Sequence, residues 1–256
     1  MKDFYEKFYA ATEHSLAHAD FCERVFGADL SQHGFADLPQ LDLLLSVTRL
    51  GPGNRALDVG CGSGLIAEYL SDKSGAHITG LDFIEEAIGQ ARGRTAAKAD
   101  RLQFMVGDMN ALELPPQSFD TLISIDTLYF PADLPGTIRQ LKEALRPGAQ
   151  MAIFFSHGWE PWNPPEEFDA STLAPDATPL GQALAAHGLH FRTWDLTAED
   201  YRLARLRMQV LEELEPRFEA EGIGFIYENR IGDSKGISHA IECGLHKRYL
   251  YHVSVQ

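Results

Sequence analysis

The sequence predicts an α/β protein with a doubly wound, mostly parallel sheet of seven strands. Between Arg55 and Gly158, strand-like and helix-like segments alternate with short connections, which is typical of a parallel sheet covered by helices. The stretch ALDVGCGSGLIAEYL places an apolar strand, a glycine-rich turn and the start of a helix in succession. With 256 residues and 45% hydrophobic content, the chain can bury one large core without disulfides or a metal.

The alternation assigns each element of this central region to a residue range. We expect strands at 55–59, 77–82, 102–107, 119–125 and 150–156, with helices between them at 65–72, 84–97 and 134–145. The last helix is followed by Arg146, Pro147 and Gly148, a cation and two helix breakers. In such sheets ligands bind at the carboxyl ends of the strands, so functional residues are expected there.

Two less regular parts flank the central region. Residues 1–50 form a predicted N-terminal helical cover, in which Asp37 is expected to cap a helix over 40–48. After the fifth strand, a loop rich in proline and acidic residues is predicted to form a lid insertion. The expected elements that follow are a helix at 180–186, a strand at 191–196, a helix at 198–221 and a strand at 248–255. The chain thus divides into the cover, 1–50, and a sheet domain, 51–256.

Composition and charge restrict the partners of the chain. The formal charge is −15 and the basic residues are scattered, so a nucleic-acid partner is not expected. The N-terminal stretch MKDFYEKFYAATEHS has no apolar run after its lysine, and no segment approaches the ~18 apolar residues that span a membrane. We therefore expect a cytoplasmic protein. Cys22, Cys61 and Cys243 form no CxxC pair, which argues against disulfides and a zinc site, and no metal is expected.

The glycine-rich turn is compatible with two classes of cofactor. Gly62, Gly64 and Ala67 satisfy the G-x-G-x-x-A pattern of dinucleotide-binding proteins, and Asp82 follows at about the ~20-residue offset that such proteins require. Asp58, however, lies in the strand just before the turn, where its carboxylate would repel a pyrophosphate. The same carboxylate would attract S-adenosylmethionine, which carries an ammonium and a sulfonium. The charge pattern therefore favours the sulfonium cofactor.

The stretch LDVGCGSG resembles the signature of the class I S-adenosylmethionine-dependent methyltransferases, which have a Rossmann-like fold, and the resemblance covers residues 55–156. Asp82 in TGLDF matches the acid that binds the ribose hydroxyls. Asp108 and Met109 in VGDMNALELP match the pair that contacts adenine, and Ile125 in FDTLISID matches the end of the fourth strand. The resemblance implies S-adenosyl-L-methionine as cofactor, held by Asp58, Gly60, Cys61, Gly62, Asp82, Phe83, Asp108, Met109 and Ile125.

Each of the three acids also has a purely structural interpretation. Asp58 would then be a turn-capping acid, Asp82 the N-cap of a helix, and Asp108 a loop acid bonded to its own backbone. These structural roles would require three acids to lie by chance at the ends of successive strands beside a glycine turn. We therefore favour the interpretation in which the three acids bind the cofactor.

The acceptor of the methyl group is predicted to be a small organic molecule, methylated on oxygen, nitrogen or carbon. The family's N/D-P-P-Y/F motif for amide and base nitrogens is absent, since the chain reads IDTLYF at that place. We expect His33, Tyr129 and Trp159 to contact the acceptor from the cover and from the ends of the fourth and fifth strands. His157 is the candidate general base, because imidazole titrates near neutral pH and the fifth strand is expected to end at Ser156.

Several alternatives remain open from the sequence. His157 would otherwise be a loop histidine bonded to backbone, and His33 would contact the carboxylate of the cofactor. Tyr5, Phe8 and Tyr9 are helix-packing residues or an aromatic cage for a cationic amine. The chain as a whole would otherwise be a regulatory protein that binds S-adenosylmethionine without transferring methyl, or a protein methyltransferase. The oligomeric state does not follow from the sequence.

Overall fold

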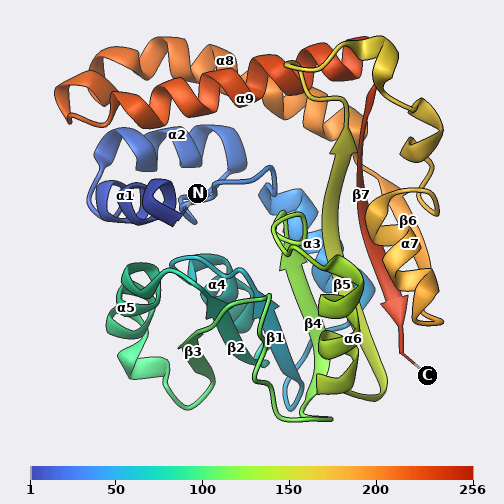
Figure 1. The fold of residues 1–256 in the computed structure, drawn as a ribbon. Helices are drawn as coiled ribbons and strands as arrows, with labels where there is room; N and C mark the ends of the chain where they lie inside the picture. Colours follow the sequence, from blue (N-terminus) through green and yellow to red (C-terminus); the bar gives the residue numbers. More distant parts are fainter. Residues whose placement is uncertain (1, 256) are drawn as a thin grey trace.

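The computed structural model describes residues 2–255. The predicted cover, 1–50, and the predicted sheet domain, 51–256, each include one residue that lies outside the described residues, namely residue 1 and residue 256. A single seven-stranded sheet crosses the molecule in the order β3-β2-β1-β4-β5-β7-β6 (Figure 1). All neighbouring strands are parallel except for β7, which runs antiparallel to β5 and β6. The predicted fold class is therefore confirmed. The strands are β1 Arg55–Val59, β2 His77–Asp82, β3 Leu102–Val106, β4 Phe119–Ile125, β5 Leu145–Gly158, β6 His190–Asp195 and β7 His246–Ser254.

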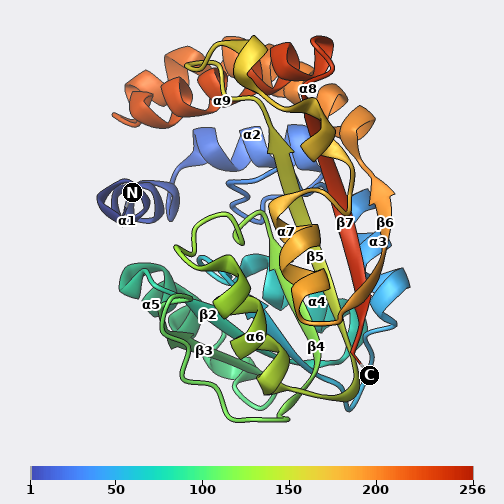
Figure 2. The same ribbon diagram turned by 45° about the vertical axis from the view of Figure 1, so that its right-hand side comes forward.

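Helices cover the sheet on both faces and extend beyond its upper edge (Figures 1 and 2). The α-helices are α1 Lys2–Thr12, α2 Leu16–Phe26, α3 Leu38–Thr48, α4 Leu65–Ser74, α5 Glu85–Arg94, α6 Leu134–Ala144, α7 Pro179–Ala186, α8 Thr197–Ala220 and α9 Gly224–Glu242. Short 3₁₀ turns lie at Ala96–Lys98, Pro165–Glu167 and Ala170–Leu173. Asp37 caps α3 as predicted, because its side chain accepts a hydrogen bond from the backbone N–H of Gln40. None of the helices in residues 2–255 is long and apolar enough to cross a membrane.

The alternation of side chains along the strands builds one apolar core on each face of the sheet. Leu57 and Leu122 point to the face covered by α6 and α7, where they join a core that includes Ile138 and Leu184. On the opposite face the core holds residues of α3, α4 and α5 together with their strand partners, among them Leu44, Ala56, Leu70, Ile88 and Ile123. Because both faces of the sheet pack against helices, the strands are fixed, and with them the glycine turn and the strand ends.

A third core joins the N-terminal cover to the C-terminal helices. Phe8 of α1 and Phe21 of α2 pack with Leu211 and Phe218 of α8 and with Ile226 of α9. In Figures 1 and 2, α8 and α9 lie side by side across the top of the molecule, with α2 beneath them. The N-terminal cover is thus held from above by helices that come from the other end of the chain.

The structure corrects two expectations about elements. The fifth strand is much longer than 150–156, because it pairs with β4 from Leu145 and stays paired with β7 up to Gly158. Helix α9 was not predicted at all, since its buried side includes Arg230, Ser234 and Ser238, so that the sequence shows no apolar stripe at helical spacing. By contrast, the strands predicted at 55–59, 77–82 and 119–125 are confirmed with the same bounds.

Candidate functional site

A pocket lies at the carboxyl ends of β1, β2 and β4, under α1 and a segment that joins α2 to α3. We call residues 30–36 of that connection the lid segment. The pocket contains about 930 Å³ of space free of atoms, its opening to solvent included. Its lining residues are Tyr5, Tyr9, Leu30, Ser31, Gln32, His33, Gly34, Ala36, Asp58, Gly60, Cys61, Gly62, Ser63, Ile66, Leu81, Asp82, Phe83, Gly107, Met109, Ile125, Asp126, Thr127 and Phe130.

The glycine turn requires glycine both for its backbone and for its close neighbours. Gly60 and Gly62 have φ values of +76° and +55°, in the left-handed region. A Cβ atom on Gly60 would overlap the side chain of Thr127, and one on Gly62 would overlap the hydroxyl of Tyr9. The turn is therefore a narrow cradle that lies beneath a tyrosine from the N-terminal cover.

Asp82 ends β2 and ties the glycine turn to the following helix. Its two carboxylate oxygens accept hydrogen bonds from the backbone N–H groups of Gly62 and Ile84, each at 2.9 Å. Burial raises the pKa of Asp82, although these hydrogen bonds act against the rise. A carboxylate has lone pairs for further donors, so this structural role leaves room for two hydroxyl groups of a ribose.

Asp58 is buried at the end of β1, beside Asp82. Burial, together with the negative charge of Asp82, raises the pKa of Asp58 to about 7. Near neutral pH this carboxyl is therefore held between its neutral and its charged form. A cationic ligand in the pocket would favour the charged form, and an anionic phosphate would be repelled by it.

Three other predicted cofactor residues, Phe83, Met109 and Ile125, line the pocket, and so does Cys61. Burial raises the pKa of the Cys61 thiol well above its ordinary value, so that this thiol is neutral. None of the three cysteines forms a disulfide. Asp108 does not line the pocket, because its exposed carboxylate accepts hydrogen bonds at 2.8 Å from the backbone and side-chain amides of Asn110.

Of the predicted acceptor contacts, His33 alone belongs to the pocket lining. Its ring lies edge-on to the rings of Tyr5 and Phe8, with centroids 5.2 and 5.1 Å away. Burial and the positive charges of Arg230 and Arg207 lower the pKa of His33 to about 3, so the ring is neutral at physiological pH. Its aromatic neighbours give that side of the pocket a largely apolar wall.

The structure does not bring Tyr129, Trp159 or His157 into the pocket. Tyr129 is 41% exposed and lies against Phe155, next to Phe130, which does line the pocket. The indole of Trp159 donates a hydrogen bond to the carbonyl of Asn163 at 2.7 Å. Tyr129 and Trp159 follow β4 and β5 as predicted, but Tyr129 packs against Phe155 of β5 and Trp159 bonds to the loop after β5.

His157 is part of β5 rather than the residue that follows its end. It pairs with Lys247 of β7, and its Nε2 lies 2.9 Å from the hydroxyl oxygen of Thr172. Burial and the nearby His246 lower its pKa. The strand end predicted at Ser156 is wrong, because β5 continues to Gly158. His157 therefore does not follow the strand at its ligand-binding edge, and its side chain does not line the pocket.

We expect His157→Ala to leave the rate of methyl transfer within about twofold of the wild-type rate, because its side chain does not line the pocket. Single-turnover transfer with a known acceptor measures this rate. A fall of roughly 10²–10⁴ with unchanged cofactor affinity would restore His157 as the general base.

Sequence reasoning missed Asp126, which lines the pocket directly after β4. It has a φ of +56°, in the left-handed region, and its carboxylate forms two hydrogen bonds with the guanidinium of Arg248 at 2.8 and 3.0 Å. One of its oxygens also accepts a hydrogen bond from the backbone N–H of Phe35 in the lid segment. Asp126 therefore joins the pocket floor to the lid. Its position directly after Ile125, at the carboxyl end of β4, was the signal in the sequence that could have identified it as a pocket residue.

Arg248 of β7 is completely buried and connects Asp126 to further elements. Its Nη1 donates to Gln40 of α3 at 2.6 Å and to the buried Asp200 of α8 at 3.1 Å. The guanidinium also stacks on Phe154, 5.0 Å from the ring centroid. One side chain thus holds β4, α3, α8 and, through Asp126, the lid segment in place.

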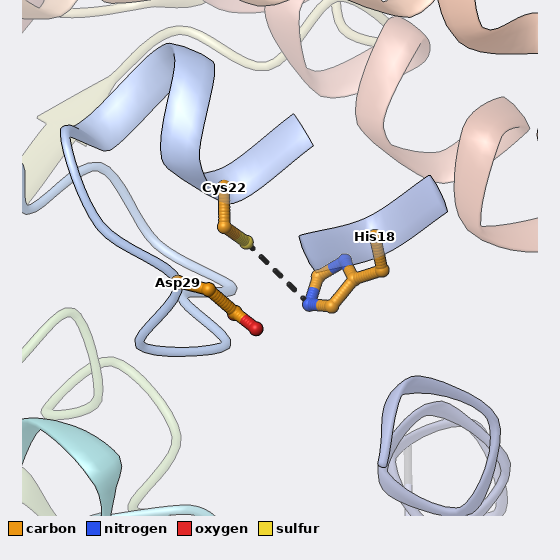
Figure 3. A group of neighbouring side chains, drawn as sticks. All are labelled: His18, Cys22 and Asp29. Carbon is orange, nitrogen blue, oxygen red and sulfur yellow. Dashed lines mark hydrogen bonds between the residues drawn. The ribbon is translucent and has the colours of Figure 1, made fainter. Parts of the chain in front are cut away.

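A group of potential metal ligands lies outside the pocket, at His18 and Cys22 of α2 and Asp29 of the loop after it (Figure 3). Their donor atoms lie within 4.8 Å of one another, and the Cys22 sulfur is 3.6 Å from His18 Nε2. Burial and the positive charge of Arg230 lower the pKa of His18 well below its ordinary value. Burial raises the pKa of the Cys22 thiol to about 12 against a smaller lowering effect of Arg230, so the thiol is neutral, and the charge of Arg230 opposes a second cation. We therefore assign no metal to this group.

Comparison with known proteins places this pocket in context. Residues 56–148 match a family described as "Methyltransferase domain". The chain is 31% identical over 209 residues to phosphoethanolamine N-methyltransferase 1 of Arabidopsis thaliana, which covers 80% of this chain and 41% of that protein. It is 35% identical over 106 residues to sterol 24-C-methyltransferase ERG6B of Gibberella zeae, which covers 40% of this chain and 28% of that protein. The chain thus matches less than half the length of either relative.

Among solved structures, phosphoethanolamine N-methyltransferase 2 of Haemonchus contortus in complex with S-adenosyl-L-methionine superimposes with a TM-score of 0.76. The superposition covers 98% of this chain and 60% of that one, at 18% sequence identity. At this identity the similarity shows that the fold is shared.

Proposed function

Through residues 56–148 the chain belongs to the class I S-adenosylmethionine-dependent methyltransferases, and we propose that it transfers a methyl group from this cofactor to a small organic acceptor. The observation that carries the proposal is the pocket itself. A glycine cradle and two buried acids, Asp58 and Asp82, meet there at the ends of adjacent parallel strands. This set of groups suits a ligand that has a ribose and positive charges and lacks phosphate.

Each part of the cofactor would meet a group suited to it. The carboxylate of Asp82 would accept hydrogen bonds from the ribose hydroxyls, and Met109 would pack on the adenine ring. Asp58 would face the positively charged amino-acid part, next to the backbone of Gly60 and Gly62. When bound, S-adenosylmethionine supplies a methyl group that is activated by the sulfonium.

The residues of the chain would then align the acceptor and exclude water. Methyl transfer is an in-line displacement, for which correct orientation removes much of the barrier. Tyr5, Phe130 and Ile125 provide apolar surface at the pocket wall, and the lid segment closes it. His33 has a pKa of about 3 and is therefore a poor proton acceptor, so we propose that proximity is the main catalytic device.

The acceptor is proposed only as a small organic molecule. The names of the two sequence relatives indicate methylation at nitrogen of phosphoethanolamine in one and at carbon of a sterol in the other. They share the cofactor chemistry and differ in the acceptor. The cytosol remains the proposed location, in keeping with the three unpaired cysteines.

Transfer of label from radioactive S-adenosylmethionine tests the proposal. The protein is incubated with small-molecule and with protein fractions of a cell extract, and each fraction is measured for label. We expect label in the small-molecule fraction. Label in protein alone would indicate a protein methyltransferase, and binding of the cofactor without any transfer would indicate a regulatory protein.

Affinity for S-adenosylmethionine is expected to rise between pH 5.5 and 7 by up to about tenfold per pH unit, because binding of the cation requires the charged form of Asp58. The raised pKa of about 7 means that the free protein holds a proton on Asp58 below this pH, and binding releases it. Calorimetry in buffers of different ionisation enthalpy measures both effects. Asp58→Asn should bind more weakly and with a flat pH dependence; an unchanged slope would remove Asp58 from the cofactor site.

A further inference from the structure

Two arginines are buried above the lid segment with most of their hydrogen-bonding groups unused. Arg207 of α8 and Arg230 of α9 both have an exposed fraction of 0%. All three guanidinium nitrogens of Arg207, and two of the three in Arg230, have no hydrogen-bond partner within residues 2–255. The remaining nitrogen of Arg230, Nη2, donates to the backbone carbonyl of Gln32 at 2.7 Å. Unpaired buried donors of this kind are rare in folded proteins because they are costly.

Neither arginine is hydrogen-bonded to a carboxylate within residues 2–255. The guanidinium of Arg207 lies 4.1 Å from the ring centroid of Phe35, and that of Arg230 lies 4.8 Å from Phe21, so each has an aromatic partner. Burial and the like charge of Arg230 lower the pKa of Arg207 to about 9, which still leaves it charged at neutral pH. The negative charge of Asp233 acts on both arginines and that of Asp200 acts on Arg207, but neither carboxylate is a hydrogen-bond partner of these arginines within the described residues. The pair therefore has unused capacity for an anion.

The lid segment separates the arginines from the cofactor pocket by a single layer of residues. Gln32 and His33 line the pocket on one side, while Gln32 accepts the hydrogen bond of Arg230 on the other. Nε2 of His33 is also buried and has no hydrogen-bond partner among the described residues, and both arginines lower the pKa of this ring. Helices α8 and α9 lie across α2 from the glycine turn (Figures 1 and 2). An anion held by the arginines would thus lie on the side of the pocket opposite the cradle of the cofactor.

We propose that Arg207 and Arg230 bind a carboxylate or phosphate group of the methyl acceptor, a proposal that rests on the function proposed above. Planar guanidinium groups form paired hydrogen bonds with such oxyanions, and two of them match the charge of a phosphate. To admit the anion, the lid segment moves aside at His33 and Phe35. The carboxylate of the cofactor has the same chemistry, but we assign the arginines to the acceptor because they lie on the far side of the lid from the glycine turn.

The test uses inorganic phosphate and acetate as probes on protein saturated with S-adenosylhomocysteine. Thermal unfolding is followed at constant ionic strength, with chloride as the balancing anion. We expect saturating phosphate or acetate to raise the Tm of the wild-type protein by about 2–4 °C, and whichever ion gives the larger shift identifies the preferred group. The absence of a shift with both ions would overturn the proposal.

Variants at the two arginines separate binding from structure. Arg207→Met and Arg230→Met should abolish the anion shift, whereas Arg205→Met, at an exposed position on the same helix as Arg207, should keep it. Without anion, Arg207→Met should have a Tm equal to or above that of the wild type, because a buried charge without a hydrogen-bond partner has been removed. Arg207→Lys, which keeps the charge but not the planar fork, should retain part of the shift. An equal shift in the wild type and in both methionine variants would contradict the proposal.

Cofactor affinity distinguishes the two sources of the anion. S-adenosylhomocysteine should bind the methionine variants within about twofold of the wild-type Kd, measured by calorimetry. A loss of about tenfold or more would reassign the arginines to the carboxylate of the cofactor and overturn the acceptor site. If the wild-type protein binds neither S-adenosylhomocysteine nor S-adenosylmethionine, the proposed function itself fails, whatever the anions do.

Discussion

Arg248→Met is expected to lower the free energy of unfolding by about 3–5 kcal/mol, because it removes the counter-ion of the buried Asp200 and of Asp126, whose side chain is only 9% exposed. Asp126 would lose both of its hydrogen bonds to the guanidinium, and Asp200 would lose one. The lid segment would also loosen, since Asp126 is held in the position from which it accepts the hydrogen bond of Phe35. We therefore expect weaker cofactor binding as well as lower stability. Urea denaturation followed by circular dichroism measures the first effect.

A matched control is the ion pair between Arg146 and Asp120 at the opposite end of the sheet. Its nitrogen and oxygen lie 2.8 Å apart, but the side chain of Arg146 is 40% exposed. Arg146→Met should therefore cost no more than about 1 kcal/mol. If Arg248→Met and Arg146→Met lower the free energy of unfolding equally, the buried network does not stabilise the fold.

Asp82→Ala is expected to weaken S-adenosylmethionine binding by about 10²–10⁴-fold. The carboxylate would accept two hydrogen bonds from the ribose, and each hydrogen bond to a charged group contributes about 1.5–3 kcal/mol. The same substitution removes the acceptor for the backbone N–H groups of Gly62 and Ile84, so the glycine cradle loses its tie to β2. Isothermal titration calorimetry gives the affinity, and circular dichroism shows whether the variant is folded.

Asp108→Ala provides the comparison for this measurement. Asp108 was also predicted to bind the cofactor, but its carboxylate is exposed and bonded to Asn110, so we expect a much smaller loss than for Asp82→Ala. An unchanged affinity in folded Asp82→Ala would mean that the ribose acid has been misassigned. Binding of NAD with comparable affinity by the wild-type chain would contradict the cofactor assignment as a whole.

The features that the sequence alone determined are those that depend on neighbouring residues. The alternation of apolar residues placed β1, β2 and β4 at their observed bounds, because a buried parallel strand needs an apolar run of this length. The spacing of Gly60, Gly62 and Gly64 predicted the turn, since the backbone there adopts positive φ values that favour glycine. Asp58 and Asp82 could be placed in one pocket because parallel strands end at the same edge of a sheet.

The features that only the tertiary structure decided depend on segments far apart in the chain. Pairing of β5 with β7, about 100 residues later, extended β5 to Gly158 and thereby kept His157 out of the pocket. Arg248 meets Asp126 across 122 positions, and neither residue carries a local signal of the other. Helix α9 buries Arg230 against a lid that begins some 200 residues earlier, with Arg230 and Gln32 198 positions apart. Local periodicity reports which face of an element is apolar, whereas the burial of a charge depends on which distant surface covers it.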